Sequence, residues 1–143
     1  MQFPKRILSG VAALAVGVGL AWTAASPSVS ATDETSTQQG VYTAEQAERG
    51  ETLFTEACLV CHQPEEFTDG GYMEGWSGQK ASDMLDLIRS TMPEDNPGRL
   101  KRQEYADIMS YLFNINGLPE GEVEMESKLM KDIRIEGPFE TQN

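Results

Sequence analysis

Histidine, cysteine and basic residues are scarce in this sequence, and each scarcity excludes a class of site. The 143 residues include 1 His and 2 Cys, and 11 Lys and Arg stand against 23 Asp and Glu, a formal net charge of −12. One histidine per chain excludes a three-histidine zinc site and a haem held by two histidines. The lack of a basic cluster excludes nucleic acid as a partner, because phosphate binding requires clustered Lys and Arg. A chain of this length holds one domain.

The N-terminal residues have the three-part layout of a secretory signal peptide. Lys5 and Arg6 precede an uncharged stretch of 16 residues, 7–22, and small residues follow up to Ala31. This stretch is shorter than the roughly 20 residues of a membrane span, so we expect removal of residues 1–31 and release into the periplasm, without a stable membrane span. The alternative is a protein tethered to the membrane by an uncleaved N-terminal segment.

Cleavage near Ala31 would leave 112 residues and change the net charge from −12 to −14, because two basic and no acidic residues are lost. Residues 32–40 lack large apolar side chains and are predicted to form a flexible leader. Order is expected to begin near Val41. Residues 122–143 form an acidic tail, in which residues 129–135 are expected to fold back as a short helix or an extended strip.

Capping and periodicity predict helices over residues 44–57, 82–89 and 101–115. The first follows Thr43 and Gln46, which have the spacing of a capping box. The stretch between the first two helices is rich in glycine and proline and is predicted to be a loop. No alternation of apolar and polar residues indicates a sheet, and the fold class is therefore predicted to be all-α.

The chemistry-bearing motif follows the first predicted helix. Cys58, Cys61 and His62 form a C-x-x-C-H sequence, which in an exported chain indicates covalent attachment of a c-type haem. Two thiols three residues apart on a tight turn can each add to one vinyl group, and the adjoining imidazole then lies beneath the iron. We expect a nearby carbonyl group to accept the hydrogen bond from the other imidazole nitrogen.

Three other interpretations of the two cysteines remain open but explain less. A thioredoxin-like redox pair requires a preceding strand and a βαβ frame, which the sequence does not indicate. A zinc site would need a carboxylate as its fourth ligand, since there is no second Cys/His pair. A structural disulfide is compatible with export but leaves His62 and the apolar residues that follow it unexplained.

A methionine thioether is the expected second axial ligand, because His62 is the only histidine. Met92 is favoured because Pro93 fixes the local backbone and the residue lies in a loop between two predicted helices. Met73 is the main rival. The remaining methionines are expected to fill the core or to lie in the tail: Met84, Met109, Met125 and Met130.

Two aromatic residues of the predicted loop are further candidates for cofactor binding. Tyr72 and Trp76 can each direct a hydrogen-bond donor toward a haem propionate while the ring packs against the macrocycle. Packing in the core explains them equally well. Tyr105 and Tyr111 are assigned to the core.

Further motifs together resemble the class I c-type cytochromes, and more narrowly the single-haem cytochromes that serve, or are fused to, bacterial periplasmic quinoprotein dehydrogenases. The resemblance spans residues 41–121, the predicted cytochrome c domain. The motifs are Ala47-x-x-Gly50-x-x-Leu53-Phe54, Met92-Pro93, Pro97-Gly98-x-Leu100, Glu104-Tyr105-x-Asp107-Ile108-x-x-Tyr111-Leu112 and Asn116-Gly117-x-Pro119.

This resemblance implies a small fold in which the first and last helices cross at Gly50, against Tyr111 and Leu112, around one covalent haem c. It also implies that Met92 is the second iron ligand. The protein would then be an electron carrier rather than an enzyme, passing one electron at a time from a donor such as a quinoprotein dehydrogenase to an acceptor such as a terminal oxidase. An acidic surface would favour electropositive redox partners.

The alternative is a haem enzyme or gas sensor with a displaceable distal ligand, for instance a peroxidase-like protein. The lack of a second histidine or of an arginine directly beside Met92 weighs against it, although Arg89 and Arg99 are near in the sequence.

Overall fold

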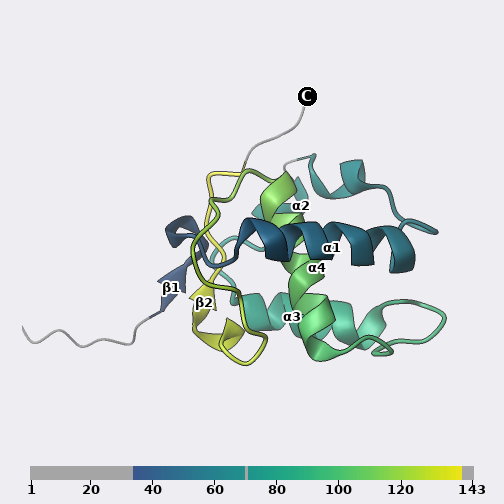
Figure 1. Ribbon diagram of the computed structural model, residues 1–143. Helices are drawn as coiled ribbons and strands as arrows, with labels where there is room; N and C mark the ends of the chain where they lie inside the picture. The colour runs from purple at the N-terminus through teal and green to yellow at the C-terminus, as the bar shows by residue number, and fades with distance from the viewer. Residues whose placement is uncertain (1–33, 70, 140–143) are drawn as a thin grey trace, which may run out of the picture. The chain divides into compact units, whose positions relative to one another are not determined.

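The computed structural model describes residues 34–69 and 71–139. The predicted signal peptide, residues 1–31, lies outside the described residues. The described chain is mostly helical (Figure 1). Its α-helices are α1 (Ala44–Ala57), α2 (Gly71–Glu74), α3 (Ala81–Thr91) and α4 (Arg102–Ile115). Short 3-10 helices η1 (Thr37–Gln39), η2 (Pro64–Phe67) and η3 (Met130–Asp132) and strands β1 (Thr35–Ser36) and β2 (Ile133–Arg134) complete it.

The three long helices follow their sequence signals. α1 has the predicted bounds, and its first turn is capped by Thr43, whose hydroxyl accepts a hydrogen bond from the Gln46 amide at 3.2 Å. α3 begins one residue earlier and ends two residues later than predicted. The predicted loop between them contains η2 and α2, so it is more regular than its glycine and proline content indicated.

α1 and α4 cross (Figure 1), and they are in contact at Gly50, as the resemblance implies. A Cβ atom on Gly50 would overlap the Asp107 carbonyl oxygen and would lie 3.0 Å from the Cβ atom of Tyr111. Only glycine therefore allows this approach of the two helix backbones. The crossing packs the middle of α1 against the middle of α4, and α1 continues from there to the first of the two cysteines.

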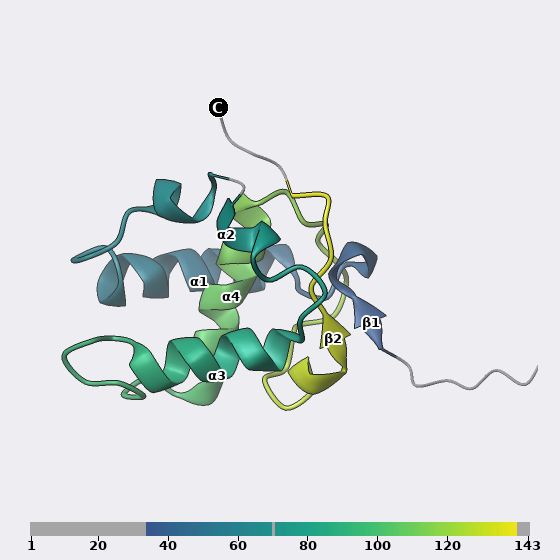
Figure 2. The ribbon, with the colours of Figure 1, turned by 180° about the vertical axis from the view of Figure 1, so that it is seen from behind.

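Residues 34–40 are not the flexible leader that the sequence predicted. β1 pairs in parallel with β2 from the far end of the chain, with Thr35 opposite Ile133 (Figure 2). The buried Thr37 hydroxyl donates to the Glu136 carbonyl oxygen at 3.0 Å and accepts from the Glu136 amide at 2.9 Å. Backbone pairing and the polar side chains of Glu34, Thr37 and Gln38 hold this segment without any large apolar side chain. The two strands are also a small exception to the all-α prediction.

The acidic tail is part of the packed structure rather than an appendage outside the domain. Met125, Met130 and Ile135 are fully buried in the same core as the helices. Residues 129–135 do fold back, and they combine the two predicted alternatives, a helical turn (η3) followed by an extended strand (β2). The apolar residues that drive this packing are spaced too irregularly to give a helical or strand pattern.

No helix in the described ranges has both the length and the apolar character needed to cross a bilayer.

Candidate cofactor site

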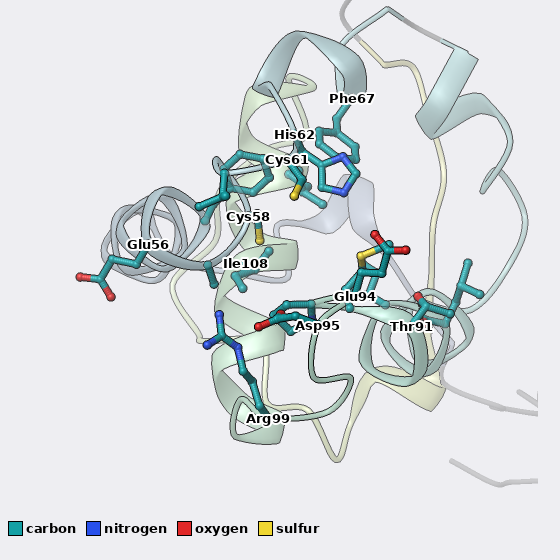
Figure 3. Close-up of a pocket in the computed structure, with 18 of the residues that line it drawn as sticks. Glu56, Cys58, Cys61, His62, Phe67, Thr91, Glu94, Asp95, Arg99 and Ile108 are labelled. Atoms are coloured by element: carbon teal, nitrogen blue, oxygen red, sulfur yellow. Dashed lines mark hydrogen bonds between the residues drawn. The ribbon is translucent and has the colours of Figure 1, made fainter.

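A cavity of about 680 Å³ opens between the end of α1, η2, the end of α3 and α4 (Figure 3). Its volume lies in the range of about 300–1,000 Å³ that is typical of cofactor sites. The apolar part of its wall is formed by Phe54, Phe67, Leu87, Ile88, Ile108 and Leu112. The other lining residues include both cysteines, the histidine and one methionine, so the sulfur and imidazole groups face a largely apolar space.

The turn that ends α1 brings the C-x-x-C-H residues to this cavity. The amides of Cys61 and His62 both donate to the Cys58 carbonyl oxygen, at 3.0 and 2.9 Å. This tight turn places all three side chains along one side of the cavity, as Figure 3 shows. Both thiols are free. Burial raises the pKa of Cys58, an effect that the Arg99 guanidinium opposes.

The His62 ring is held on two sides. Its Nδ1 atom lies 3.1 Å from Oε2 of Glu66, and its ring centroid lies 5.6 Å from that of Phe67. With Glu66 ionised, Nδ1 carries the proton and donates a hydrogen bond to the carboxylate. Nε2 is then the nitrogen with a lone pair available for a metal. The predicted carbonyl acceptor is therefore wrong, since the partner of the imidazole is a carboxylate.

Glu66 was missed because its role depends on a short 3-10 helix. Gln63 is the N-cap of η2, Pro64 is its first residue, and Glu66 reaches back to accept the Gln63 amide at 3.0 Å through Oε1. That capping spacing was present in the sequence and is the signal that would have found it. The hydrogen bond from His62, followed by that from the Gln63 backbone, holds the pKa of Glu66 below its usual range.

Met92 lies at the end of α3 and lines the cavity. Within the described residues it is the one methionine that does so. The rival Met73 is fully buried in the core and is not among the lining residues. The Met92 backbone is tightly held, because its amide donates to the Ile88 carbonyl at 2.7 Å and its carbonyl accepts from the Tyr105 hydroxyl at 2.7 Å.

The two aromatic candidates of the predicted loop occupy different positions. Tyr72 lines the cavity and packs edge to face on Phe67, with ring centroids 4.8 Å apart. Burial raises the pKa of Tyr72, and a hydrogen bond with Trp76 opposes the shift. Trp76 packs against the core and is not among the lining residues.

Four charged side chains also line the cavity. Glu94 and Asp95 follow Met92 in the loop after α3, opposite the cysteines in Figure 3, and Glu56 lies at the end of α1. Arg99 contributes a positive charge to the same wall. The apolar wall suits a ligand with apolar faces, and Arg99 is the lining side chain that can pair with a carboxylate of such a ligand, whereas the three acidic side chains would repel one.

The donor set fits a c-type haem. Two free thiols, an imidazole with a defined free nitrogen and one thioether all reach a single apolar cavity large enough for a cofactor. No group of three or more His, Cys, Asp or Glu side chains is arranged as a metal site within residues 34–69 and 71–139.

Comparisons of the chain with protein-family models, with curated proteins and with solved structures found no match in any of the three.

Proposed function

We propose that this protein is an exported c-type cytochrome that carries single electrons, with one haem c bound covalently in the 680 Å³ cavity. The observation that supports it most is the convergence on that cavity of the four side chains that such a cofactor requires: Cys58, Cys61, His62 and Met92. Three of them are close in the sequence, but Met92 comes from the end of a different helix. Its position on the same cavity therefore supports the proposal independently of the C-x-x-C-H motif.

Each residue has a defined role in this proposal. Cys58 and Cys61 form the thioether tethers, and His62 and Met92 hold the iron from its two sides. When bound, the haem supplies reversible one-electron exchange between ferrous and ferric iron. Because His62 and Met92 would both be engaged in holding the iron, the site would supply electron exchange rather than a place for a substrate, which favours an electron carrier over an enzyme. A thioether ligand and an apolar wall both favour the reduced state.

The finer fold and the partners belong to the same proposal. The crossing of α1 and α4 at Gly50 is the arrangement that the resemblance to class I c-type cytochromes implies. The periplasm is the proposed compartment. A quinoprotein dehydrogenase as donor and a terminal oxidase as acceptor are the proposed partners, and the net charge of −12 favours partners with an electropositive face.

A haem enzyme or gas sensor with a displaceable distal ligand is the second candidate, and two features of the site favour it. The carboxylate of Glu66 makes His62 a stronger donor, which stabilises ferric iron. Arg99 adds a positive charge to the cavity wall, where it can stabilise an anionic ligand. The two candidates differ in whether Met92 stays bound to the iron.

Purification of the protein from a host with a complete cytochrome c maturation apparatus tests both candidates. The carrier is expected to have the mass of the polypeptide plus one haem, a weak far-red methionine-to-iron band when ferric, and no reaction with carbon monoxide when ferrous. A high-spin ferric spectrum with ready carbon monoxide binding would favour the second candidate. A colourless protein with the mass of the polypeptide alone would overturn both.

A further inference from the structure

Glu66 is engaged through both of its carboxylate oxygens. Oε1 accepts the Gln63 amide at 3.0 Å, and Oε2 lies 3.1 Å from Nδ1 of His62. The first contact is a helix cap and the second is to the proposed proximal ligand. A carboxylate that is fixed by one oxygen presents the other in a defined direction, so the position of Oε2 is set by η2 itself.

Two groups contact the His62 ring. Phe67, which follows Glu66 directly, lies against the ring and also packs edge to face on Phe54, with centroids 5.7 Å apart. Phe54 is 3 % exposed, so this stack connects η2 to the core. The imidazole is therefore confined by a carboxylate at its edge and an aromatic ring at its side.

We propose that Glu66 is a positioning residue that sets the reduction potential through His62. This inference rests on the proposed function. An ionised carboxylate hydrogen-bonded to Nδ1 fixes the tautomer that leaves Nε2 for iron and increases the electron donation of that nitrogen. Greater donation stabilises ferric iron more than ferrous iron, so Glu66 lowers the potential. Its effect opposes that of the Met92 thioether and the apolar wall, which raise the potential.

The direct test is the midpoint potential of the haem-loaded Glu66→Gln variant. Glutamine keeps an oxygen acceptor and is tolerated at this position of a capping box, but it removes the negative charge from Nδ1. We expect the equilibrium constant for reduction to rise about tenfold, which is about 59 mV for one electron.

Glu65→Gln is the matched control. Glu65 is the neighbouring residue of η2 and carries the same charge, and its side chain makes no hydrogen bond within the described residues. A general loss of negative charge would shift both variants equally, whereas the proposal expects a much larger shift for Glu66→Gln. Equal shifts in the two variants, or no shift in Glu66→Gln, would overturn it.

A second measurement tests the proposal if the Glu66→Gln variant does not incorporate haem. The Met92→Ala protein, which keeps Glu66, is expected to give a five-coordinate ferrous haem whose iron–histidine stretching frequency can be measured by resonance Raman spectroscopy. A frequency typical of a carboxylate-bonded histidine supports the proposal, and one typical of a carbonyl-bonded histidine overturns it. Either result presupposes a haem, so a haem-free wild-type protein would count against the proposed function instead.

Discussion

The Tyr105 hydroxyl donates a hydrogen bond of 2.7 Å to the carbonyl oxygen of Met92. Tyr105 belongs to α4 and is 1 % exposed, whereas Met92 ends α3. The same carbonyl also accepts the Gly98 amide at 3.2 Å, which closes the loop of residues 92–98 on itself. The rigid core thus holds the backbone of Met92 while its side chain remains on the cavity.

Tyr105→Phe is expected to weaken the hold on Met92 without changing the core. The ring remains, and the Gly98 amide still occupies the carbonyl, so the loss is that of one buried hydrogen bond, about 1 kcal/mol. If this bond holds the proposed iron ligand in place, imidazole should displace Met92 from the ferric haem with an affinity raised about fivefold. Titration with imidazole, followed by the loss of the far-red band, measures this affinity.

Tyr111→Phe provides the control for this prediction. Tyr111 is also on α4 and its ring lies 5.4 Å from that of Phe54, but its hydroxyl has no hydrogen-bond partner in the described part of the chain. Its imidazole affinity should equal that of the wild type. If Tyr105→Phe also bound imidazole with wild-type affinity, the bond to Met92 would have no part in ligand retention.

The far-red ferric band is expected to be lost in Met92→Leu and kept in Met73→Leu. The substitution conserves volume and costs less than about 1.5 kcal/mol at either position. Met92→Leu should lose the far-red ferric band and bind carbon monoxide when reduced, because the proposed ligand on the cavity is gone. Met73→Leu should keep the band, since Met73 is buried in the core away from the cavity. Retention of the band in Met92→Leu would mean that another group binds the iron.

The long helices and the C-x-x-C-H side of the site could be predicted from the sequence. α1 and α4 were predictable because capping residues and three- and four-residue apolar spacing are local signals. The C-x-x-C-H turn is local too. The position of Met92 next to Pro93 in a loop favours it over Met73, and the structure places Met92 on the cavity and Met73 in the core.

Contacts between distant residues, and a contact that depends on a short 3-10 helix, were harder to predict. The pairing of Thr35 with Ile133 joins residues near opposite ends of the chain through backbone groups, and backbone groups leave no pattern in a sequence. The contact of Glu66 with His62 is local in the sequence, but it depends on η2, a four-residue 3-10 helix that only the spacing of Gln63 and Glu66 indicates. The leader and the carbonyl acceptor were wrong for these two reasons.

Gly50→Ala is expected to prevent the close crossing of α1 and α4. The new Cβ atom would overlap the Asp107 carbonyl oxygen, a backbone atom that cannot turn away, so the helices must separate. Overpacking of this kind costs about 1–3 kcal/mol or more, which outweighs the gain of up to about 1 kcal/mol from alanine in a helix. Gly71→Ala is the control, because its Cβ would meet nothing closer than 3.5 Å. Denaturant unfolding measures both, and equal stabilities would refute a close crossing.

Gln46→Leu is expected to loosen the tail. The buried Gln46 amide donates to Asp107 Oδ1 at 2.9 Å and to the Met125 carbonyl at 3.0 Å, and it accepts the Met125 amide at 2.7 Å. Leucine would leave the Met125 amide without its acceptor, at a cost of about 1–3 kcal/mol, whereas Asp107 Oδ1 and the Met125 carbonyl would keep the hydrogen bonds from Gln103. Hydrogen exchange should increase around Met125. Gln103→Leu removes similar bonds at a part-buried site where water can replace them, so a smaller loss is expected. The reverse order would contradict this role of Gln46.

Tyr42 should make the protein less stable at alkaline pH. Its hydroxyl is buried and donates to the Leu118 carbonyl at 2.6 Å, and burial raises the pKa of Tyr42 to about 12. The unfolded phenol ionises at about 10, so the contribution of Tyr42 to stability is complete below pH 10 and is lost as the pH rises to about 12. Tyr42→Phe cannot ionise, and it should be less stable than the wild type at pH 8 by about 1 kcal/mol. This difference in the free energy of unfolding, measured with denaturant, should shrink between pH 10 and 11, and a constant difference would show that Tyr42 ionises equally in both states.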